Sequence, residues 1–145
     1  MAFDGHRVRL TLPSSFDLLD IVQLLSDRLA ALAGLDDDST HWIGVAVRES
    51  VINAIKHANR EDRSKHVSVE LVLEPRARPE QFTVEVLDEG QGFDPEAIAN
   101  PLDPENVLKS NGRGIFFMRS FMDEVSMSRR PGGGMAVRMS KKLTS

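Results

Sequence analysis

The chain has 145 residues, of which 41% are hydrophobic and 28% charged, proportions typical of a single globular domain spanning residues 1–145. Eighteen basic against twenty-two acidic residues give a net charge of −4, which excludes a protein-wide basic surface for nucleic acid or an anionic membrane. The absence of cysteine excludes disulfides, thiolate nucleophiles and thiolate metal sites. With no signal peptide and no membrane-spanning apolar run, we expect a cytoplasmic protein that binds a small molecule or another protein.

The first part of the chain predicts one strand followed by two helices. Residues 6–12 alternate polar and apolar, as in a half-buried strand. Apolar residues recur at helical spacing over 16–34, where Gly34 is suited to end the helix. After the acidic turn at 36–39, a second helix is predicted from about Thr40 to Ala58.

The rest of the chain supplies the remaining strands of a sheet. Segments of period-two alternation lie at 66–74, 81–88, 124–130 and 135–143, the last two joined by a Pro-Gly-Gly-Gly hairpin turn. Residues 93–111 contain three prolines and no sustained period, which is typical of a functional lid, and a third helix begins near Gly114. Together these elements predict an α+β, two-layer sandwich, with three helices on one face of a mixed, mostly antiparallel sheet.

The stretch "ESVINAIKHA" carries polar residues within the second predicted helix. Glu49 and Asn53 are one turn apart on the same face. Such a stripe is commonly a solvated face. It is also a pair of oxygen-bearing side chains that could hold a hard cation or position a nucleophile, and Asn53 has no evident capping role.

Two glycine-containing motifs lie further along the chain. "DEGQG" ends a predicted strand, with Asp88 as a hydrogen-bond acceptor and Gly90 and Gly92 allowing close approach of a ligand. "NGRG" places Gly112 and Gly114 at the start of a helix, where free backbone N–H groups favour phosphate. Taken singly, each motif is equally compatible with an ordinary turn.

The order of these motifs is more specific than any one of them. "ExxxNAxxH", then "DxGxG", then a lid and "GxG" resembles the GHKL ATP-binding superfamily, which includes gyrase, MutL and histidine-kinase catalytic domains. The short chain and "GRGIFFMRSFMDEV" are most similar to the anti-sigma-factor serine/threonine kinases of the RsbW and SpoIIAB type. The resemblance spans nearly the whole chain and implies a Bergerat-type ATP-binding fold.

The resemblance implies distinct roles for the motif residues. Asn53 would coordinate Mg²⁺ bridging the ATP phosphates, and Glu49 would act as general base or water-positioning carboxylate. Asp88 would accept a hydrogen bond from the adenine amino group, with Gly90 and Gly92 making room for the base. Phosphate contacts would come from the 93–111 lid and its flank, namely Lys109, Gly112, Arg113 and Gly114.

The function implied is an ATP-dependent serine/threonine protein kinase that phosphorylates a small STAS-type antagonist and sequesters a sigma factor, exchanging one partner for the other. The alternative is a nucleotide-binding anti-sigma module with little turnover, because Gly134 is followed by Met135 where such proteins commonly have threonine. A detached histidine-kinase catalytic domain is a third, less favoured reading. The oligomeric state is open, with a homodimer among the candidates.

Overall fold

The protein is described by a computed structural model that covers residues 2–60, 62–90 and 118–143. A 3₁₀ turn precedes α1, a π-helical turn (Ala54–Ala58) extends α2, and residues 118–121 form a helical turn before β4. The strands and α-helices, in chain order, are β1 (His6–Pro13), α1 (Leu19–Leu32), α2 (Asp37–Asn53), β2 (His66–Glu74), β3 (Gln81–Leu87), β4 (Glu124–Arg129) and β5 (Met135–Lys142).

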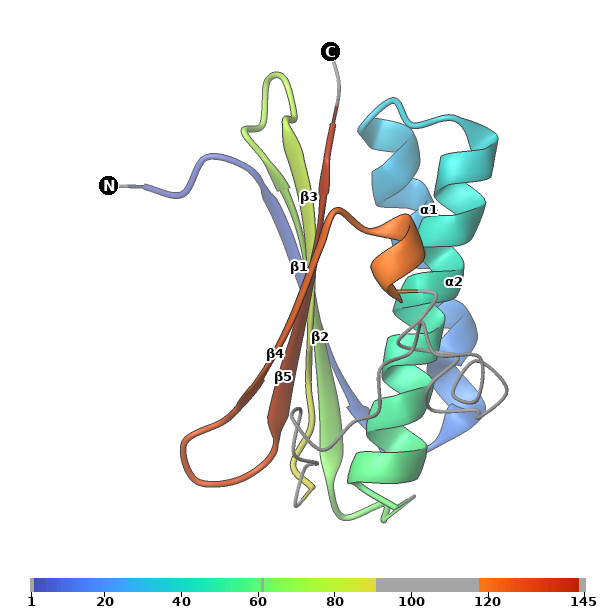
Figure 1. Cartoon of the computed structure of the whole chain (residues 1–145), viewed down its shortest axis with the longest axis vertical. Coiled ribbons are helices and arrows are strands. Elements are labelled where there is room, and N and C mark those ends of the chain that lie inside the picture. The colour runs from blue at the N-terminus through green and yellow to red at the C-terminus, as the bar shows by residue number, and fades with distance from the viewer. Residues whose placement is uncertain (1, 61, 91–117, 144–145) are drawn as a thin grey trace.

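The five strands form one sheet in the order β1-β2-β3-β5-β4. Figure 1 shows α1, α2 and the turn at 118–121 on one side of this sheet, which confirms the predicted α+β two-layer sandwich. All pairings between the described strands are antiparallel, so the sheet is more uniform than the mixed one expected. The predicted hairpin is confirmed, because β4 and β5 pair with Arg129 opposite Met135.

The helix α2 begins earlier than the sequence pattern predicts. The side chain of Asp36 caps it by accepting a hydrogen bond of 2.7 Å from the N–H of Ser39. Asp37 and Asp38 occupy the first turn, where the helix dipole favours negative charge. The segment expected to be an acidic turn is therefore the cap and first turn of α2. In the part of the chain that the structure describes, neither helix combines the length and the apolar character needed to cross a bilayer.

The core lies between the helices and the inner face of the sheet. The strand β2, which lies between β1 and β3, contributes every second residue, and all four of its inward side chains are fully buried: Val67, Val69, Leu71 and Leu73. The opposing helices contribute Val22, Ile43, Val47 and Val51. This packing fixes α2 across the sheet and so determines where its polar residues lie.

The core makes a testable prediction at Leu71, which has no exposed surface. Leu71→Ala should lower the free energy of unfolding by about 2–5 kcal/mol, because it removes buried methyl groups and leaves a cavity in the centre of the sheet. Leu24→Ala, at a side chain that is 67% exposed on α1, is the matched control and should change it by less than about 0.5 kcal/mol. Urea denaturation measures both, and equal losses would contradict this placement of the core.

Candidate functional site

A small pocket lies between the C-terminal part of α2 and the inner face of the sheet. Its lining is mostly apolar, with three polar side chains from α2 and from the residue that follows β3. The lining residues are Ser50, Asn53, Ala54, Val86, Asp88, Met118, Met127 and Val137. Two predicted site residues from distant parts of the sequence, Asn53 and Asp88, therefore meet in one pocket.

Asp88 directly follows β3 and is buried, with 3% of its surface exposed. One carboxylate oxygen, Oδ1, accepts hydrogen bonds from the backbone N–H groups of Met135 at 3.0 Å and Gly90 at 3.1 Å. Among the described residues, no donor reaches the other oxygen, Oδ2. The carboxylate is thus held by the backbone on one side and left with accepting capacity for a ligand on the other.

Burial raises the pKa of Asp88 above its ordinary value, because water no longer solvates the charged form. The amide hydrogen bonds from Met135 and Gly90 oppose this rise in pKa, as do the positive charges of Arg130 and Lys65. A carboxylate that is buried, yet held by specific donors, is typical of a binding or catalytic site.

The β4–β5 hairpin fixes the backbone of Asp88 from the other side. Gly134 has a φ of +94°, and the Asp88 carbonyl lies where a Cβ atom would stand, so that only glycine fits. The guanidinium of Arg130 donates a hydrogen bond of 2.7 Å to the same carbonyl. The side chain of Met135 is fully buried, and its carbonyl accepts from the N–H of Asp88 at 3.0 Å. Met135 therefore reaches Asp88 through its backbone.

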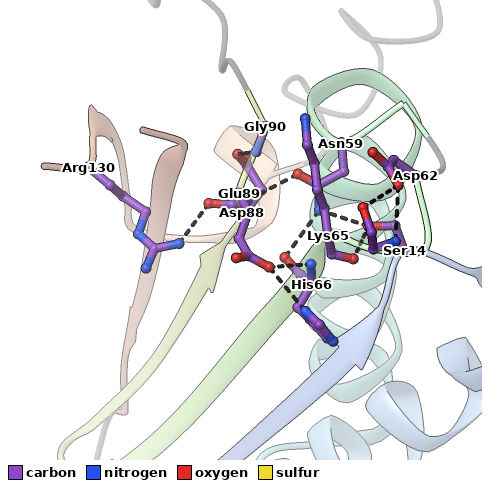
Figure 2. A network of polar contacts seen from close by, with 10 residues as sticks. Ser14, Asn59, Asp62, Lys65, His66, Asp88, Glu89, Gly90 and Arg130 are labelled. Carbon is purple, nitrogen blue, oxygen red and sulfur yellow. Dashed lines mark hydrogen bonds and ion pairs between the residues drawn. The ribbon is translucent and has the colours of Figure 1, made fainter. Parts of the chain in front are cut away.

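The segment after Asp88 is tied to the end of the α2 extension by Asn59, as Figure 2 shows. The side-chain oxygen of Asn59 accepts from the N–H of Glu89 at 3.0 Å, and its amide nitrogen donates to Ser14 Oγ at 2.8 Å and to the His66 carbonyl at 3.1 Å. The Glu89 carboxylate in turn accepts from the backbone N–H of His66. Four segments are thereby joined next to Asp88.

Glu49 and Asn53 lie on α2, one turn apart, and both are half-buried. Asn53 is the last residue of α2, and the helix widens directly after it into the π-helical turn Ala54–Ala58. Single π turns within helices occur frequently at functional sites. Asn53 lines the pocket, whereas Glu49 lies one turn earlier in α2 and is not among the lining residues.

The predicted glycine-rich and lid residues divide into two groups. Gly90 is described, is buried, and donates its N–H to Asp88. The predictions for the lid at 93–111 and for Gly92, Lys109, Gly112, Arg113 and Gly114 fall outside the described residues.

The sequence reasoning missed three residues of this site. Ser50 lies within the buried face of α2, and a hydroxyl inside the apolar stripe was a signal that could have identified it. Asn59 follows the helix as many surface residues do, and Arg130 precedes a glycine-rich turn. The local sequence around Asn59 and Arg130 does not show whether these side chains are solvated or contact the segment that contains Asp88.

Comparison with known proteins agrees with this geometry. Residues 13–141 match the model of the histidine kinase-like ATPase domain, so the chain belongs to that family. Within the family it belongs with the serine-protein kinases of the RsbW type. It is 30% identical to serine-protein kinase RsbW of Staphylococcus epidermidis, over 86% of this chain and 80% of the relative. It is 29% identical to serine-protein kinase RsbW of Bacillus subtilis, over 99% of this chain and 89% of the relative.

The close approach of Gly134 to Asp88 makes a prediction with a matched control. Gly132 and Gly134 both have positive φ, but a Cβ at Gly132 meets open space. Gly132→Ala should cost only the backbone strain, about 1–2 kcal/mol of unfolding free energy. Gly134→Ala should cost about 1–3 kcal/mol more, because Asp88 must shift, and should also weaken nucleotide binding. Urea denaturation and calorimetric titration measure the two effects, and indistinguishable variants would contradict the contact.

The raised pKa of Asp88 makes a prediction about pH. The folded state binds this proton more tightly than the unfolded state, so unfolding free energy falls as pH rises from the ordinary pKa of about 3.9 through the higher folded value. Asp88→Asn removes this cost. The nucleotide-free variant should therefore be more stable than the native protein at pH 7, with the difference shrinking towards pH 4.

The control for the pH prediction is Asp62, an exposed carboxylate whose pKa is lowered by side-chain and backbone hydrogen bonds from Ser64. Asp62→Asn should change stability in the opposite direction, because the charged form of Asp62 is favoured by folding. Urea unfolding over a pH series compares the three proteins. A profile for Asp88→Asn that runs parallel to the native one would contradict a desolvated carboxylate.

Proposed function

We propose that the chain transfers the γ-phosphoryl group of ATP to a serine or threonine of a small STAS-type antagonist protein, with Glu49, Asn53 and Asp88 as its principal site residues. The observation that carries this proposal is the pocket that brings Asn53 and buried Asp88 together beneath the helix that bears Glu49. The relatives named serine-protein kinase support the reaction class.

In this proposal Asp88 recognises the base. Its Oδ2 accepts a hydrogen bond from the adenine amino group, while Met135 and Gly90 hold Oδ1. The apolar lining from Val86 and Val137 would face the ring of the base, and because the cavity holds about 10 Å³ of free space in this structure, the lining would have to move apart as the base enters. We also assign to Gly90 and Gly92 the role of leaving room for the base.

The phosphate end would lie towards the end of α2. The side-chain oxygen of Asn53 would hold Mg²⁺ between the phosphates, since an amide oxygen is a ligand that this cation prefers. We assign the remaining phosphate contacts to the segment that begins with the 93–111 lid. They are Lys109, Gly112, Arg113 and Gly114, through charged side chains and backbone N–H groups.

ATP, when bound, supplies the phosphoryl group and ADP is its leaving group. Glu49 takes the proton from the target hydroxyl as the oxygen attacks phosphorus, so that the carboxylate ends protonated and the hydroxyl becomes the phosphate ester. Its half-buried place on α2, one turn from Asn53, would put it at the phosphate end of the site rather than at the base. Phosphoryl transfer needs such positioning more than covalent chemistry from the protein.

For its second partner we propose a sigma factor, which the chain would hold when the antagonist is phosphorylated, acting in the cytoplasm and as a monomer or homodimer. The competing function is a binding module with little turnover. Met135 favours that alternative, because a threonine at this position would offer the nucleotide a hydroxyl, whereas the methionine sulfur is only a weak acceptor. Incubation with Mg·ATP and the antagonist, followed by intact mass of the antagonist, separates the two functions.

Glu49→Gln provides the decisive variant. It should leave ATP affinity within about twofold and slow phosphorylation by about 10²–10⁴-fold, the usual contribution of a general base. Glu85→Gln, on β3, removes the same charge away from the pocket and is the control. Calorimetry measures binding and mass spectrometry measures transfer. Native transfer rates in Glu49→Gln would rule out the assigned role.

A further inference from the structure

Ser50 is a polar residue of the pocket to which the proposed function gives no task. It lies on α2 three residues before Asn53, with 2% of its surface exposed. Its neighbours on the inward stripe of α2 are Val47, Val51 and Ala54. An aliphatic residue would fill this position without an unpaired polar atom, so the hydroxyl calls for a physical reason.

The hydroxyl of Ser50 has no hydrogen-bond partner among the described residues. Leaving a buried hydroxyl unpaired is unfavourable, and native proteins rarely do so outside functional sites. One other buried serine in the described part of the chain shares this condition, Ser26 on α1. Only Ser50 lines the pocket that contains Asp88, so only Ser50 has a place where a ligand could supply the missing partner.

The chemistry of the base gives this hydroxyl a task. Adenine presents its amino group, a donor, beside ring nitrogens that are acceptors, so pairing along one edge of the base needs one acceptor and one donor from the protein. An ionised Asp88 is an acceptor only, whereas a serine hydroxyl can donate. The third polar residue of the lining, Asn53, is taken by the phosphate end in the proposed function.

We propose that Ser50 is a second base-recognition residue, whose Oγ–H donates to a ring nitrogen next to the adenine amino group, directly or through one buried water. This inference rests on the proposed ATP site and adds selectivity to it. Asp88 and Ser50 together present an acceptor and a donor, the complement of adenine. Guanine carries a carbonyl where adenine has the amino group, and so meets the acceptor Asp88 with a second acceptor.

Ser50→Ala is the test, with Ser26→Ala as matched control. Both variants remove a buried hydroxyl that lacks a partner, so both should be as stable as the native protein or more stable in thermal denaturation without nucleotide. Only Ser50→Ala should weaken ATP binding, by about 3- to 10-fold in Kd, the size of one net hydrogen bond. Equal losses of affinity in both variants, or none in Ser50→Ala, would overturn the proposal.

Analogue nucleotides separate a hydrogen bond from a change of shape. The analogues 1-deaza-ATP and 7-deaza-ATP each lack one ring nitrogen next to the amino group. The native protein should bind one of the two about 3- to 10-fold more weakly than ATP, namely the analogue that lacks the nitrogen to which Ser50 donates. Ser50→Ala should bind ATP and that analogue equally. If the variant keeps the native preference for ATP, or if the native protein prefers ATP over neither analogue, Ser50 does not donate to the base.

Two further results keep this inference distinguishable from the proposed function. If the native protein binds no ATP in calorimetry, the ATP site itself is wrong and the inference falls with it. If the native protein binds ATP and Asp88→Asn abolishes binding while Ser50→Ala does not weaken it, the site stands and the inference alone is refuted. Should Ser50→Ala fail to fold, Ser50→Cys replaces the hydroxyl by a slightly larger group that is only a weak donor, and it should also weaken ATP binding.

Discussion

The site depends on two hydrogen bonds that backbone N–H groups donate to one carboxylate oxygen of Asp88. Because Met135 and Gly90 both donate to Oδ1, the orientation of the side chain is fixed, and Oδ2 keeps its capacity to accept from a ligand. A ligand therefore meets a carboxylate whose desolvation has already occurred during folding. The raised pKa of Asp88 reflects this desolvation, which destabilises the charged carboxylate in the folded protein. Nucleotide binding therefore does not have to remove water from the carboxylate a second time.

This arrangement explains why so much polar structure surrounds a short segment. Arg130 holds the Asp88 carbonyl from the hairpin, and Asn59 holds the next residue, Glu89, from the end of the π-helical turn. The two contacts come from opposite sides of the strand end. Together they hold the backbone on both sides of the Asp88 carbonyl against the displacement that a buried charge would otherwise favour.

The sequence was sufficient for the fold and for part of the site. Period-two alternation located each described strand, and helical spacing located α1 and α2, since each element has one clearly apolar face. Asn53 and Asp88 were predicted from motif order, and the structure brings both to one pocket. The start of α2 was missed because an aspartate such as Asp36 can either cap a helix or form a turn, and the residues after it decide between the two. Asn59 and Arg130 act through long-range contacts that leave no local pattern.

The hairpin turn between β4 and β5 has a consequence for how this protein tolerates change in length. Exposed glycine-rich turns usually accept insertions readily. Here the end of the turn takes part in the site, because the Met135 amide donates to the Asp88 carboxylate and the Gly134 backbone lies against the Asp88 carbonyl. A residue added next to Gly134 would displace both contacts, whereas one added at Gly132 or Gly133, where a Cβ meets open space, would leave them and the β3–β5 pairing in place. The turn is therefore constrained only where it enters β5 and is open to change in length at its tip.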